Sequence, residues 1–124
     1  MSSISERLQA VEGRIAKALA SRKSEIEQPG PICLIAVSKN HAAEVVEEAL
    51  EAGLTVFGEN RVQEALPKIE HIGAKAKWHL IGHLQTNKAK QIVGKVALIH
   101  SVDSERLLQQ IEQEAAKQGI SQEV

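Results

Sequence analysis

Tyrosine is absent from the sequence, and only two of its 124 residues are aromatic, Phe57 and Trp78. Cysteine occurs once, at Cys33, which excludes an intrachain disulfide and a zinc site built from cysteines. Because Cys33 lies inside an apolar run at 32–37, we expect a buried structural thiol. The lack of tyrosine limits the proton-transfer chemistry that the chain can perform.

Strong net charge and long apolar runs are also missing. The 15 Lys and Arg residues nearly balance the 16 Asp and Glu residues, so no strong field favours binding to nucleic acid or to a membrane surface. No apolar run approaches the ~20 residues that span a bilayer, and residues 1–13 lack the apolar core of a signal peptide. We therefore expect a cytoplasmic protein whose partner is a small molecule or another protein.

Apolar periodicity predicts one helix followed by four strand–helix units. Apolar residues recur at mostly three- and four-residue steps across 3–27, which indicates an amphipathic helix. Four short apolar segments have the length and composition of strands, at 32–37, 54–57, 77–81 and 96–100. A helical pattern follows each strand, and Pro67 predicts a bend or a break in the helix after the second strand.

Repeated strand–helix units build parallel sheets with right-handed crossovers. The predicted fold class is therefore α/β, a single domain in which each strand neighbours the next. We expect the last helix to begin at a capping residue, Asp103 or Ser104, and to end at Gly119.

Polar residues follow each predicted strand. They are Lys39, then Asn60, then His83 with Gln85, and finally Ser101 with Asp103. In parallel α/β folds the carboxyl ends of the strands meet at one edge, where binding sites lie. The pattern predicts a binding pocket at this edge, although polar residues also gather at strand ends without any function.

Lys39 is the most informative of these residues. It ends a wholly apolar segment, so we expect partial desolvation, which favours the nucleophilic free amine that forms Schiff bases with aldehydes. On local chemistry alone, a lysine that extends into solvent is the more common situation. Asn60 has a similar alternative, because it can cap the helix that begins near Arg61.

Histidines and lysines offer two further patterns. His79 and His83 lie ~13 Å apart along a strand, too far to share a zinc ion, so we predict no metal site. His79 alternates with apolar neighbours and is most simply a core histidine. Six lysines between Lys68 and Lys95 face a single acid, Glu70, which favours an anionic ligand or simply a solvated surface.

Four strings of residues resemble the pyridoxal phosphate homeostasis protein family. They are Ile-Ala-Val-Ser-Lys at 35–39, Phe-Gly-Glu-Asn-Arg-Val-Gln-Glu at 57–64, Trp-His-Leu-Ile-Gly-His-Leu-Gln-Thr-Asn-Lys at 78–88, and Ile-His-Ser-Val-Asp-Ser at 99–104. The resemblance covers the chain after its first helix. It departs at Asn40-His41, where relatives commonly carry a run of threonine, lysine and proline.

The resemblance implies a TIM-type barrel similar to the barrel domain of alanine racemase. Such a barrel takes ~250 residues, so residues 1–124 are expected to form a partial barrel with only about the first four of eight strands. The family lysine, here Lys39, holds pyridoxal 5'-phosphate (PLP) as a Schiff base. Asn60 lines the cofactor ring in this comparison, and His79 and the Leu84-Gln85 segment are weaker contacts. The residues that anchor the phosphate group lie in the other half of the family's barrel.

Three functions remain open at this point. The resemblance favours a PLP-binding protein of cofactor homeostasis without catalytic residues. An enzyme similar to a racemase or decarboxylase is the alternative, but similar racemases use a tyrosine opposite the lysine, and this chain has none. The third is a half-barrel without a ligand, whose open sheet edges favour self-association.

Overall fold

The computed structural model describes residues 3–22 and 32–124 of the chain. The helices are α1 (Ile4–Ala20), α2 (Ala43–Glu51), α3 (Val62–Ile72), α4 (Ala89–Ile92) and α5 (Glu105–Gln118), with short 3-10 turns η1 (Gly73–Lys75) and η2 (Thr86–Lys88). The strands are β1 (Ala36–Val37), β2 (Val56–Glu59), β3 (Lys77–Leu80) and β4 (Leu98–Ile99). Within the described residues, no helix is long and apolar enough to cross a membrane.

The four strands form one parallel sheet in the order β1-β2-β3-β4, which confirms the predicted α/β class and strand order. The pairing places Val37, Gly58, His79 and Leu98 in one row across the sheet. After α5 the chain returns to β4, where Glu123 pairs with Leu98 in a parallel bridge. The next parallel segment thus lies at the edge where a fifth strand is expected.

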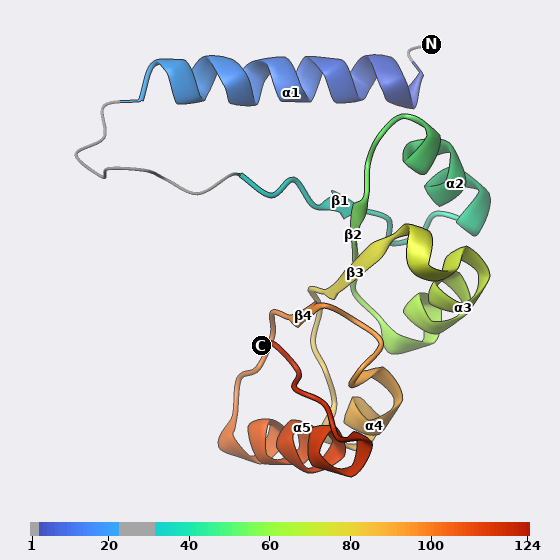
Figure 1. Ribbon diagram of the computed structural model, residues 1–124, viewed down its shortest axis with the longest axis vertical. Coiled ribbons are helices and arrows are strands. Elements are labelled where there is room, and N and C mark those ends of the chain that lie inside the picture. The colour runs from blue at the N-terminus through green and yellow to red at the C-terminus, as the bar shows by residue number, and fades with distance from the viewer. Residues whose placement is uncertain (1–2, 23–31) are drawn as a thin grey trace.

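The helices after the strands cover one face of the sheet (Figure 1). Phe57, Trp78, Leu80 and Ile99 point to this face and are almost fully buried among helix residues such as Val46. The rings of Phe57 and Trp78 lie with their centroids 5.6 Å apart. This layer is the hydrophobic core that holds the strand ends in place.

The other face of the sheet is only partly covered. Side chains alternate along a strand, so the neighbours of the buried residues point this way. We call this side the open face, and it carries Ile35, Val37, Val56, Gly58, Lys77, His79, Ile81 and Leu98. Val37 is 49% exposed although it belongs to an apolar run, which it ends.

The predicted end of the first helix is wrong. Helix α1 stops at Ala20, where the Ser21 hydroxyl donates to the carbonyl of Ala18 and the chain turns. Residues 23–27 of the predicted helix lie outside the described residues. Leu8 is the one buried residue of α1, so most of its apolar stripe contacts the sheet only loosely.

Two expectations about the segment before the paired part of β1 are also wrong. Strand pairing in the predicted 32–37 strand is confined to Ala36 and Val37, and Ile32 is 53% exposed. Cys33 is exposed and is therefore not a buried structural thiol. Both residues precede the paired part of β1, so nothing in the sheet covers them.

Pro67 does not break helix α3, contrary to one of the two predicted outcomes. The helix runs through it from Val62 to Ile72. Pro67 is exposed, so water can serve the carbonyl group that the proline nitrogen leaves without a donor.

Candidate functional site

Lys39 follows β1 at the carboxyl edge of the sheet. It is exposed and lies in a turn completed by Asn40, whose φ of 65° is left-handed. The predicted partial desolvation of Lys39 is therefore wrong, because the turn lifts the side chain away from the core. The neighbouring Ser38 points to the helix side and is buried, while Val37 belongs to the open face.

A buried ion pair contacts Ser38, the residue before Lys39. The ammonium of Lys68 on α3 lies 2.9 and 3.0 Å from the two carboxylate oxygens of Glu59 at the end of β2. Lys68 also donates to the carbonyl of Ser38 over 2.8 Å, and the Ser38 hydroxyl donates to Glu59. Glu59 is 1% exposed and Lys68 is 8% exposed, so both charges are satisfied inside the protein.

This network fixes the position of the residue before Lys39. It joins the end of β1 to the end of β2 and to α3, so the backbone of Ser38 cannot move independently of either. Sequence reasoning counted Lys68 only among the six lysines between Lys68 and Lys95. The spacing of nine residues conceals the contact, because it depends on how α3 folds back on β2.

Replacing Lys68 with methionine is expected to lower the free energy of unfolding by roughly 3–5 kcal/mol, because Glu59 would then be a buried charge without its partner. Urea denaturation of the wild-type and variant chains measures this difference. Lys90→Met is the matched control, since Lys90 is exposed and its replacement is expected to change stability by less than about 0.5 kcal/mol.

A second variant separates the lost charge partner from poor packing of methionine. Combining Lys68→Met with Glu59→Gln removes both charges, so the double variant is expected to be more stable than Lys68→Met alone. A double variant as unstable as the single one, or a cost of Lys68→Met below about 1 kcal/mol, would contradict the assigned role of the ion pair.

Asn60 lies at the end of β2, next to the turn after β3. A Cβ atom on Gly82 would lie 2.4 Å from the carbonyl oxygen of Asn60, so only glycine allows the two segments to approach this closely. The hydroxyl of Ser101, after β4, donates to the carbonyl of Gly82. The residue that precedes α3 is Arg61, and no side chain caps the helix there, so the alternative in which Asn60 caps α3 is not realised.

His79 lies on the open face of β3, with an exposed fraction of 9%. Its Nδ1 atom lies 2.9 Å from Nε2 of His100, just after β4. Burial lowers the pKa of His79, and nearby His100 and Lys77 lower it further, while Glu123 opposes them. The neutral ring is therefore favoured, and its contact with His100 requires one donor and one acceptor nitrogen. Sequence reasoning found no partner for His100, because the two histidines are 21 residues apart.

Gly58 separates His79 from Val37 in the row across the sheet. A Cβ atom at this position would lie 3.0 and 3.1 Å from methyl groups of Ile35 and Ile81. Only glycine therefore lets the side chains of Ile35 and Ile81 approach this closely over β2. Gly58 lies two residues before Asn60.

The structure thus brings together part of the predicted set. Lys39 and Asn60 follow neighbouring strands, which are ~5 Å apart. His79 lies on the next strand, β3, two residues before the position level with Asn60. His83 is exposed and faces Asp103 at 3.6 Å, away from this group. In the part of the chain that the structure describes, no three His, Cys, Asp or Glu side chains are grouped as metal ligands.

These features define a class of protein, the first half of a parallel β/α barrel with an exposed lysine after its first strand. The chain belongs to the family of the alanine racemase N-terminal domain, whose family model matches residues 14–124. Its relatives within that family are pyridoxal phosphate homeostasis proteins, which confirms the resemblance drawn from the four strings.

Similar proteins are known from sequence and from structure. The pyridoxal phosphate homeostasis protein of Aquifex aeolicus is 45% identical over 122 residues, which cover 96% of this chain and 51% of the relative. PipY of Synechococcus elongatus, solved with PLP bound, has a TM-score of 0.69 and 39% identity, over 94% of this chain and 50% of that one. A protein of unknown function from Bifidobacterium adolescentis has a TM-score of 0.79 and 32% identity, over 96% and 52%. The chain spans about half the length of the relatives that it matches.

Proposed function

We propose that this chain provides the lysine-bearing half of a PLP-binding protein of cofactor homeostasis, with PLP held as a Schiff base on Lys39. The observation that carries the proposal is the exposed Lys39 at the carboxyl edge of the sheet, anchored through Ser38 to the buried ion pair of Glu59 and Lys68. The structural similarity to PipY, which was solved with PLP bound, supports the same assignment.

The residues near Lys39 suit an aromatic aldehyde. The amine of Lys39 attacks the aldehyde carbon, a C=N bond forms and water leaves, which requires access and no further protein group. Asn60 offers an amide for a polar ring substituent, and the methyl groups of Ile35 and Ile81 over Gly58 offer an apolar surface for a flat ring. His79 then faces the ring as a neutral side chain, since burial lowers its pKa.

We propose that the protein is a carrier and not an enzyme. PLP supplies an electron sink when bound, and similar racemases use a tyrosine opposite the lysine as a second group that moves protons. The chain has no tyrosine for that role. His79 lies within strand β3 and is hydrogen-bonded to His100, so we do not assign it the role of a second proton-transfer group.

Titration of the chain with PLP tests this function. We expect an absorption band of the Schiff base to appear, with no change in an added amino acid such as L- or D-alanine. Racemisation or decarboxylation of the amino acid would support the enzyme instead. No band at PLP concentrations well above the protein concentration would leave only the half-barrel without a ligand.

A further inference from the structure

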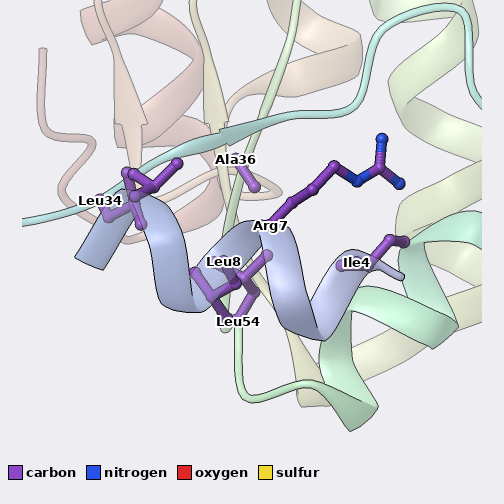
Figure 2. Close-up of a pocket in the computed structure, with 7 residues that line it drawn as sticks. Ile4, Arg7, Leu8, Leu34, Ala36 and Leu54 are labelled. Carbon is purple, nitrogen blue, oxygen red and sulfur yellow. The ribbon is translucent and has the colours of Figure 1, made fainter. Parts of the chain in front are cut away.

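A polar cavity lies beside the start of α3, away from the apolar crevice under α1 that Figure 2 shows. Its volume is about 300 Å³. It is lined by Arg61, Val62, Gln63, His83, Gln85 and Lys88. Three of these side chains carry basic groups, two are amides, and none is acidic.

Two of the three basic groups of this cavity have no acidic partner among the described residues. Among the residues that the structure describes, neither Arg61 nor Lys88 has a carboxylate within 4 Å, and His83 faces Asp103 at 3.6 Å. Two other lysines of the basic segment lie differently. Lys75 shares a hollow with Glu47 and Glu51, and Lys95 shares one with Glu70.

The backbone adds positive potential to the same place. The carbonyl of Arg61 accepts hydrogen bonds from the amides of Glu64 and Ala65. In the described part of the chain, the amide groups of Val62 and Gln63 donate to no protein acceptor. No side chain caps this end of α3, which has 11 residues. Free amide groups and the helix dipole together favour a negative charge at this point.

We propose that this cavity binds the phosphate group of a small phosphomonoester. Arg61, just before α3, and Lys88, at the end of η2, supply the positive charge. Gln63 and Gln85 supply amide donors. The lysines between Lys68 and Lys95 were expected either to bind an anionic ligand or to form a solvated surface. The proposed site corresponds to the first alternative, and Lys88 is the one of these lysines that lines the cavity. Lys39 does not line the cavity, so phosphate binding here does not depend on Schiff-base formation.

The test measures the binding of inorganic phosphate to the full chain by phosphorus NMR. Arg61→Gln and Lys88→Gln are each expected to weaken binding by about five- to tenfold, and raising the salt concentration is expected to weaken it further. Lys90→Gln is the matched control, because Lys90 is exposed two residues away and does not line the cavity. It is expected to leave phosphate binding unchanged.

Two results would overturn the proposal. The first is that the wild-type chain binds phosphate no more tightly than the Arg61→Gln, Lys88→Gln double variant. The second is that Lys90→Gln weakens phosphate binding as much as Arg61→Gln or Lys88→Gln, which would indicate attraction by the general surface charge. Competition in a Lys39→Ala background identifies the source of the phosphate group. Displacement by PLP alone indicates the cofactor, and equal displacement by glycerol phosphate indicates any phosphomonoester. Because inorganic phosphate is the probe, loss of PLP capture at Lys39 would leave this result unaffected.

Discussion

Lys39→Ala is expected to abolish covalent capture of PLP, because the lysine amine is the nucleophile that forms the C=N bond. The variant chain is expected to show no absorption band of the Schiff base. Borohydride reduction of the wild-type complex, followed by peptide mapping, is expected to place the label on Lys39. Lys39 is exposed, so the free energy of unfolding is expected to change by less than about 0.5 kcal/mol.

Lys90→Ala is the control for this experiment, since Lys90 is an exposed lysine of another element. It should keep the absorption band and the label on Lys39. If the label of the wild-type chain is found mainly on Lys88 or Lys90, the choice of Lys39 is wrong. Label on Lys88 would instead indicate that PLP reacts from the cavity beside α3.

The strand order could be predicted because it depends on local signals. Each apolar segment is followed by a helical pattern, and such units permit little besides a parallel sheet with neighbouring strands. Helix α5 was predicted for the same kind of reason. Its cap is Ser104, whose hydroxyl accepts from the amide of Leu107, and it ends at Gly119 with a left-handed φ of 67°. Both signals lie within the helix or next to it.

The errors concern coverage by distant parts of the chain. An apolar run such as 32–37 does not indicate how much of it pairs, and Val37 on the open face is 49% exposed. Cys33 was assigned to the core by its neighbours alone. The same reasoning extended the first helix beyond Ala20, where the structure ends it.

The candidate site divides in the same way. The position of Lys39 and Asn60 at one edge of the sheet could be predicted from the sequence, because both follow strands and strand ends meet at one edge. The partners that hold them were not found. Lys68, Gly82 and His100 act through contacts with residues 9 to 30 positions away, which only the folded chain brings together.

The affinity of this chain for PLP is expected to be far below that of a full-length relative such as the Aquifex aeolicus protein. The resemblance places the residues that anchor the phosphate group in the half of the barrel that the chain does not span. Charge-assisted hydrogen bonds contribute ~1.5–3 kcal/mol each, so two of them are worth ~3–6 kcal/mol. This difference corresponds to roughly a hundredfold to over ten-thousandfold in affinity.

Side-by-side dialysis of both PLP-loaded proteins measures this difference, and we expect this chain to lose its cofactor first. Association of two chains along their open sheet edges would rebuild part of a barrel, and retention would then rise with protein concentration. Capture of the phosphate group by the cavity beside α3 would be independent of protein concentration and would be weaker in Arg61→Gln. Equal retention by a dilute monomer that carries Arg61→Gln would show that phosphate anchoring contributes much less than two charged hydrogen bonds. In that case Lys39 and the ring contacts near Asn60 would account for most of the affinity.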